Sequence, residues 1–167
     1  MSFYDASVPA FLQILGALSG LLTKAEAHCA AKNIQPDVLL ASRLYPDMFP
    51  LSRQIQLACD FAAKSCARLT HSEVPSTPDT EKTFAELRQR LAKTGDYLKT
   101  FKPAQFEGAE GRDVTFPVGP ERTITLNGQE FLNRFAFPNF YFHAAIAHGI
   151  LRHNGVEVGK RDFLGVS

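Results

Sequence analysis

The chain has 167 residues, and its 18 Lys and Arg against 17 Asp and Glu leave a net charge of +1 at pH 7. A chain of this length buries about 70% of its unfolded surface, so one domain over residues 1–167 is expected. No run of one charge sign is present, which excludes a nucleic-acid-binding stripe and a polybasic membrane anchor. The apolar stretches are too interrupted to span a membrane, and the first residues do not form a secretory signal, so a cytoplasmic location is expected.

The first half of the chain predicts two long helices, because apolar residues recur every three or four positions. The first helix runs from about Ser7, its expected cap, to about Lys32. A proline-rich connector over residues 34–49 follows, which we expect to be an ordered crossover with a helical turn near residues 37–44. The second helix is predicted from Pro50 to about Thr70.

The second half predicts a surface loop, a helix, a hairpin and a last helix. Thr77, followed by Pro78 and Asp79, is a strong helix start, and the third helix is expected to continue to about residue 101. Two β-prone runs at 113–118 and 122–126 predict a short hairpin. The last helix is expected from Asn127 to Asn154, with Pro138 bending it. The predicted fold is therefore all-α, a four-helix bundle with a crossover between helices 1 and 2 and a short β-hairpin before the last helix.

The cysteines give no sign of chemistry. Cys29, Cys59 and Cys66 are odd in number and contain no C-x-x-C pair, so neither a disulfide framework nor a thiolate zinc site is expected. Reduced thiols packed in the core are the expected state.

Three polar side chains fall on the inward faces of the predicted helices. At 100° per residue, Asn139 and His143 lie within the apolar stripe of the last helix, flanked by Phe135 and Phe142, and Gln54 points inward from the second helix. A buried polar group without a partner costs about 1–3 kcal/mol, so these groups should meet each other, water, an ion or a ligand. We therefore expect a ligand pocket lined by these five residues, with His143 as the metal ligand or general base if the pocket is active; the alternative is a core histidine with satisfied ring nitrogens.

The opposite face of the last helix predicts a covered aromatic surface. Phe137 and Tyr141 point outward on the same helical wheel, and His148 also lies opposite His143. The hairpin, a tail carrying Phe163 and Leu164, or a second subunit could cover this face. A homodimer is therefore expected.

Four segments resemble the domain-of-unknown-function family numbered 1993. They are YDASVP at 4–9, LYPDMFPL at 44–51, FPNFYFH at 137–143 and ILRHNGVEVGK at 150–160. The resemblance covers essentially the whole chain. It implies the fold of the DinB-like (DinB/YfiT) helical bundles, to which that family is assigned, with a pocket between the helices.

The resemblance also implies where a metal would lie. In many DinB-like relatives, one His on the second helix and an H-x-x-x-H pair on the last helix bind a divalent metal, often nickel or zinc. His143 matches the second His of that pair, Asn139 stands where the first should be, and Gln54 is the nearest counterpart of the third ligand. One imidazole and two amides make a poor zinc or nickel site, so a divalent metal is expected only as a weakly held ion.

Three functions remain open from the sequence. The first is a bundle whose core pocket binds a small molecule or a weak ion. The second, which the resemblance to the DinB-like bundles implies, is a metal-dependent transferase or isomerase that uses His143, and the third is a purely structural homodimer.

Overall fold

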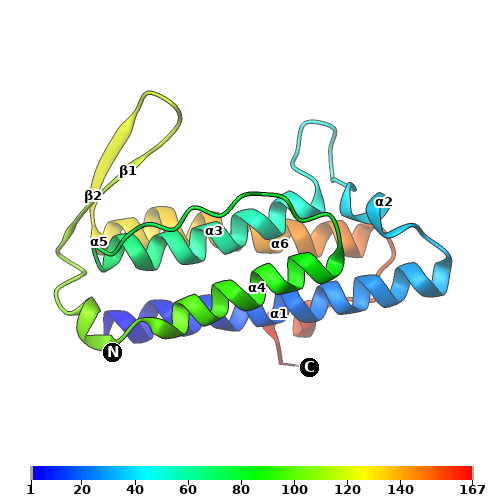
Figure 1. Ribbon diagram of the computed structural model, residues 1–167, viewed down its shortest axis with the longest axis horizontal. Helices are drawn as coiled ribbons and strands as arrows, with labels where there is room; N and C mark the ends of the chain where they lie inside the picture. Colours follow the sequence, from blue (N-terminus) through cyan, green and yellow to red (C-terminus); the bar gives the residue numbers. More distant parts are fainter. Residues whose placement is uncertain (1, 167) are drawn as a thin grey trace.

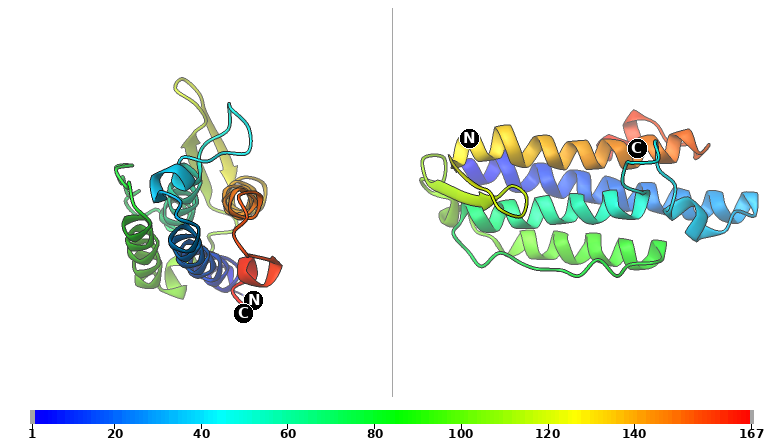
Figure 2. Two further views of the ribbon diagram at one scale, coloured as in Figure 1. Left: turned by 90° about the vertical axis from the view of Figure 1, so that its right-hand side faces the viewer. Right: turned by 90° about the horizontal axis from the view of Figure 1, so that it is seen from above.

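The computed structural model describes residues 2–166, in which helices run nearly the whole length of the molecule (Figure 1). The elements in chain order are α1 (Phe3–Lys32), α2 (Pro36–Leu40), α3 (Leu51–Leu69), α4 (Phe84–Thr100), the 3-10 helix η1 (Pro103–Phe106), strands β1 (Asp113–Pro117) and β2 (Thr123–Asn127), α5 (Gly128–Glu130), the π-helical segment η2 (Phe131–Ala136), α6 (Phe137–His153) and α7 (Lys160–Leu164). The long helices α1, α3, α4 and α6 pack side by side (Figure 2). The prediction of a mainly helical fold with one hairpin is confirmed.

The long connection of the bundle lies between α3 and α4. Residues 33–50 join α1 to α3 at one end of the bundle, so these two helices are antiparallel. The sequence predicts a crossover here, but the connector stays at that end and does not cross the bundle. Residues 70–83 instead run back along the bundle before α4 begins, so that α3 and α4 are parallel (Figure 1). Two side-chain contacts agree with this direction: Arg90 pairs with Asp60 of α3, and Tyr97, further along α4, donates to the carbonyl of Glu73, which lies beyond the end of α3.

The hairpin has a regular antiparallel register and projects from one end of the bundle (Figure 1). Asp113 pairs with Asn127, and Pro117 pairs with Thr123. Alternate residues of β1 are buried, and its Phe116 packs on Phe131 and Phe135 of η2 at ring-centroid distances of 4.9 and 4.3 Å.

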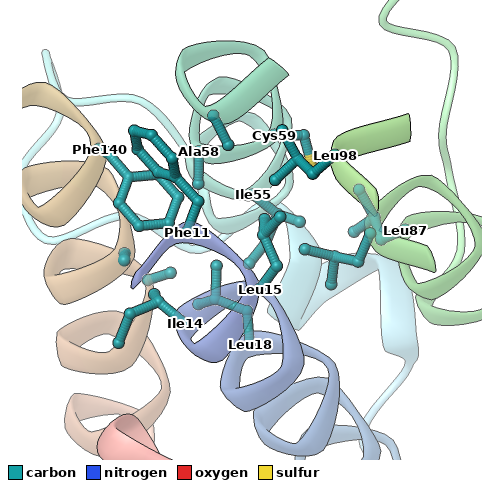
Figure 3. Packing of buried hydrophobic residues seen from close by; sticks show 14 of the residues in the cluster. Phe11, Ile14, Leu15, Leu18, Ile55, Ala58, Cys59, Leu87, Leu98 and Phe140 are labelled. Atoms are coloured by element: carbon teal, nitrogen blue, oxygen red, sulfur yellow. The ribbon is translucent and has the colours of Figure 1, made fainter. Parts of the chain in front are cut away.

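The core lies where α1, α3, α4 and α6 meet (Figure 3). Phe11 of α1 contacts Phe140 of α6 edge to face, with ring centroids 4.8 Å apart, and both rings are fully buried. Aliphatic side chains of α1, α3 and α4 fill the remaining space, among them Leu15, Leu18, Ile55, Leu87 and Leu98. A buried phenylalanine or leucine of this kind stabilises the fold by about 1.5–3 kcal/mol.

The starts of α1 and α4 differ from the prediction. Ser2 caps α1 in a capping box with Asp5, whereas Ser7 is buried and its hydroxyl donates to the carbonyl of Phe3 at 2.8 Å. Thr83 caps α4 in a capping box with Glu86, so Thr77 does not begin a helix. Side-chain bonds to the first backbone N–H groups decide both starts, because those groups have no partner within the helix.

The last helical region begins as predicted, but its irregular part lies before Pro138. The Asn127 side chain accepts a hydrogen bond from the Glu130 N–H at 2.9 Å, which confirms the predicted cap. Pro138 lies in the first turn of α6, where its missing N–H is tolerated, and the irregular part is the π-helical η2 before it. Gly155 at φ +84° follows the end of α6, a conformation that favours glycine.

The predicted outer face of α6 is partly covered by the chain itself. Phe137 is half-buried against Phe11, with ring centroids 5.1 Å apart. α7 packs on α1, and its Phe163 contacts His148 of α6 at 5.9 Å. The tail thus supplies one of the three expected covers.

The three cysteines are free and buried. Burial raises the pKa of Cys59 to about 12 and also raises the pKa of Cys66, so both thiols stay protonated and unreactive at neutral pH.

Helix α1 is long and apolar enough to span a membrane by length and composition alone. Half of its most apolar window is buried inside the bundle, as in the core helix of a soluble protein.

Candidate functional site

Gln54 and His143 meet at the contact between α3 and α6. Gln54 lies in the first turn of α3 and is 1% exposed, and His143 lies in α6 and is 8% exposed. The Gln54 Oε1 atom is 2.8 Å from His143 Nδ1. The Gln54 Nε2 atom donates to the carbonyl of Phe49 at 3.0 Å.

This pair of hydrogen bonds fixes the tautomer of His143. A backbone carbonyl only accepts hydrogen bonds, so the amide of Gln54 must present its nitrogen to Phe49 and its oxygen to His143. Nδ1 of His143 therefore carries the proton and donates to Gln54. The second ring nitrogen, Nε2, is left as an acceptor, and no side chain or backbone group of residues 2–166 donates a hydrogen bond to it.

The surroundings keep His143 neutral. Its pKa is lowered to about 4, first because burial disfavours the charged ring and second because the positive charge of Arg53 repels it. The ring of Phe61 stacks on the imidazole at 5.5 Å with an angle of 18° between the planes. At neutral pH, the site therefore presents an uncharged imidazole whose Nε2 accepts a hydrogen bond.

Asn139 is not part of this contact. Its Nδ2 atom donates to the carbonyl of Phe135, one turn earlier in the chain, at 2.7 Å. The side chain thus satisfies a backbone carbonyl of η2, where the π-helical turn changes the usual hydrogen-bonding pattern. The structure brings together Gln54 and His143 of the expected polar set and leaves Asn139 apart.

The two expected phenylalanines lie in different places. Phe135 packs on Phe61 at 5.9 Å, and the two rings line a small cavity of about 170 Å³ beside α3. Phe142 is 53% exposed, so the expectation that it lies inside the bundle is wrong. The buried face of α6 is centred near Phe140, because α6 packs against both α1 and α3 and Phe11 occupies the space next to Phe140.

The residues do not fit a divalent metal site. Within residues 2–166, no group of three or more His, Cys, Asp or Glu side chains could hold a metal ion. His143 Nδ1 is occupied by Gln54, Asn139 is bonded to its own helix, and Arg53 places a positive charge beside the ring. An amide oxygen is a weak ligand for nickel or zinc, and the cation of Arg53 further disfavours a divalent ion.

Two contributors to the site were missed from the sequence. Phe61 lies seven residues after Gln54, so a helical wheel places both on one face of α3, and this spacing could have revealed it. The positive charge of Arg53, on the same helix, lowers the pKa of His143, and no local sequence pattern indicates this effect.

Comparison with known proteins agrees with the fold. The family model described as Domain of unknown function (DUF1993) matches residues 3–164. The chain belongs to the DUF1993 family. A solved structure of a DinB family member protein from Shewanella denitrificans is 46% identical to this DUF1993 chain, with a TM-score of 0.91. That match covers 98% of this chain and 92% of the other, which supports the DinB-like assignment, and a search of the curated proteins found no match.

Proposed function

We propose that this protein is a DinB-like bundle that binds a small molecule at His143 without a metal. The single observation that supports this function most is the hydrogen bond from His143 Nδ1 to Gln54, which leaves Nε2 as an acceptor without a protein partner. An imidazole held in one tautomer binds a donor with less loss of entropy than a freely turning one. The ligand would therefore carry an O–H or N–H group.

The aromatic surroundings favour a flat ligand. Phe61 stacks on one face of the imidazole, and Phe142 meets it edge to face at 5.4 Å. Phe49 and Phe142 are both about half exposed, although rings of this size are usually buried. An aromatic alcohol or amine could place its ring against these side chains and its donor on Nε2.

The enzymatic alternative is weaker on chemical grounds. A general base works best when its pKa lies near the operating pH, and the pKa of His143 lies near 4. The metal that would supply the chemistry of a transferase or isomerase also lacks a suitable ligand set. His143 is therefore proposed as a binding residue.

The test compares phenol with anisole, which has the same ring but cannot donate a hydrogen bond. We expect phenol to shift the amide resonances around Gln54 and His143 in NMR spectra, with at least fivefold weaker binding of anisole. His143→Phe keeps a stacked ring but removes the acceptor and should abolish the preference for phenol. His148→Phe is the matched control on the opposite side of α6, and it should leave the preference intact. Equal binding of both probes, or an unchanged preference in His143→Phe, would contradict the proposal.

A second measurement addresses the metal directly. The untagged protein, titrated with Ni²⁺ or Zn²⁺ in a calorimeter, should show no tight stoichiometric binding. The double variant Gln54→His and Asn139→His, which supplies two further imidazoles, should bind at least tenfold more tightly. Stoichiometric tight binding by the unaltered protein would show that the metal-free proposal is wrong.

A further inference from the structure

The cavity of about 170 Å³ beside α3 lies next to the hairpin and does not include Gln54 or His143 in its lining. The hairpin rises beside the end of α3 (Figure 1). Apolar and charged side chains from three elements line the cavity: Leu57, Asp60, Phe61, Lys64 and Arg68 of α3, Pro117 of β1 and Phe135 of η2. A protein cavity of about 150 Å³ accommodates a benzene ring, so the volume here suits a molecule with a single ring.

The hairpin wall of the cavity is held against the end of α3 by hydrogen bonds. His71 donates from Nε2 to the carbonyl of Asp113 at 3.0 Å. The guanidinium of Arg112 donates to the carbonyl of Leu69 at 2.5 Å. The fold itself therefore fixes the hairpin beside α3, and the cavity does not need a bound molecule to form it.

Arg68 is the cation of this lining that has no acidic partner. Its guanidinium lies over the ring of Phe116, 5.7 Å from the centroid, and forms no ion pair with a carboxylate of residues 2–166. A cation–π contact uses none of the N–H donors of the guanidinium. Burial lowers the pKa of Arg68, but the group stays charged at neutral pH because the pKa of a guanidinium is far higher. A half-buried cation has lost part of its hydration, which an anion would replace.

The donors of Arg68 can be reached from solvent. Within residues 2–166, the side-chain nitrogens that are both enclosed and without a partner belong to Arg88, Arg90 and His148. Arg68 is only half-buried, and its guanidinium makes no hydrogen bond to those residues, so its nitrogens are open to a bound molecule.

The other charged side chains near the cavity neutralise one another. Asp60 binds Lys64 through Oδ2 at 2.8 Å and Arg90 through Oδ1 at 2.7 Å, so both of its oxygens are engaged. The whole network joins three carboxylates to three cations: Asp60, Asp79 and Glu81 with Lys64, Arg53 and Arg90. Arg68 lies outside this network and therefore supplies the net positive charge of the cavity.

We propose that this cavity binds a small organic anion, a carboxylate attached to a single aromatic ring, with the carboxylate on the guanidinium of Arg68. A guanidinium can donate two parallel hydrogen bonds to a carboxylate, which makes it the best matched side chain for this group. The ring would lie against Phe61 and Phe135, whose own rings meet edge to face at 5.9 Å. This ligand differs from the neutral donor proposed for His143, and the two sites share only the side chain of Phe61.

Benzoate is the probe, because at pH 7 it carries a carboxylate and no hydrogen-bond donor for His143. NMR titration of the full chain should shift the amides of residues 57–68 and 116–118, with a dissociation constant of about 1 mM, as small fragments give. Nitrobenzene has the same shape but no net charge, and it also lacks a donor. It should bind at least tenfold more weakly, because it offers Arg68 no anion.

Variants of the charge separate this cavity from other surfaces. Arg68→Gln should weaken benzoate binding at least tenfold, and Arg68→Lys, which keeps the charge but not the paired donors, should weaken it less. Arg152→Gln removes the same charge at an exposed position of α6 outside the cavity and should leave binding unchanged. Thermal unfolding of each variant checks that it folds.

Three outcomes would overturn the proposal. They are the absence of benzoate-induced shifts in the cavity residues, equal binding of benzoate and nitrobenzene, and normal benzoate binding by a folded Arg68→Gln variant. The comparison of the two probes uses the unaltered protein, so it decides the proposal even if Arg68→Gln does not fold.

Discussion

At the residue scale, the chemistry of His143 is decided by three neighbours. Gln54 fixes its proton on Nδ1, Phe61 covers one face of the ring, and Arg53 lowers its pKa together with burial. None of these contacts is local to α6, since Gln54 is 89 positions away in the chain. The residue type alone therefore indicates a candidate, and the packing of α3 on α6 gives it a protonation state.

The lowered pKa predicts a specific loss of stability in acid. An unfolded histidine titrates near pH 6.5 and His143 near 4, so protons bind the unfolded chain preferentially between these values. The contribution of His143 is complete above pH 6.5 and is lost as the pH falls toward 4. Between pH 7 and 4.5, the free energy of unfolding should fall by roughly 1–3 kcal/mol more in the unaltered protein than in His143→Gln.

Urea unfolding at several pH values measures this difference. The variant is the necessary reference, because the carboxylates lose stabilising interactions in acid in both proteins. Parallel pH profiles for the two proteins would show that His143 is not held neutral by the fold.

At the element scale, capping decides where α4 begins. The sequence predicts a start at Thr77, which precedes a proline and an aspartate, and not at Thr83, which precedes Glu86 by three residues. In the structure, Thr83 forms the capping box, and Asp79 pairs with Arg53 and Arg90. The ion pairs hold residues 78–81 against the bundle in a non-helical conformation, which the local preference of Thr77 and Pro78 does not reveal.

This difference gives a matched prediction for α4. Thr83→Ala should lower the free energy of unfolding by about 1 kcal/mol, because the N–H of Glu86 loses its side-chain acceptor. Thr77→Ala should change it by less than about 0.5 kcal/mol, because Thr77 is exposed and caps no helix. Chemical unfolding monitored by circular dichroism measures both. A larger effect at Thr77 would mean that α4 begins earlier than the structure indicates.

At the scale of the whole molecule, the homodimer stays a prediction, but the surface on which it depends is a different one. Phe137, on which the expected homodimer partly depended, is half-buried against Phe11. The most exposed apolar side chains within residues 2–166 include Val38 and Tyr45 of the segment joining α1 to α3. A second copy would bury this surface, and we expect the dimer interface to form there.

Light scattering coupled to size exclusion should give twice the chain mass of 18.4 kDa. Tyr45→Asp should shift the protein toward the single-chain mass, because association would bury a charge. Val166→Asp introduces the same charge at an exposed apolar site in the tail and should leave the mass unchanged. A mass of one chain for the unaltered protein would contradict the dimer.

The cytoplasmic location also stays a prediction.

The sequence by itself determined the mainly helical class, the hairpin, the Asn127 cap and the resemblance to the DUF1993 family. These features follow from periodicity, turn residues and capping, which act over a few neighbouring positions. Only the tertiary structure decided that Phe140 faces the core and Phe142 does not, that Gln54 binds His143, and that Arg90 is enclosed by the 70–83 connection. The physical reason is that a helical wheel gives the relative angles of side chains, whereas the direction of the core depends on where the other helices pack.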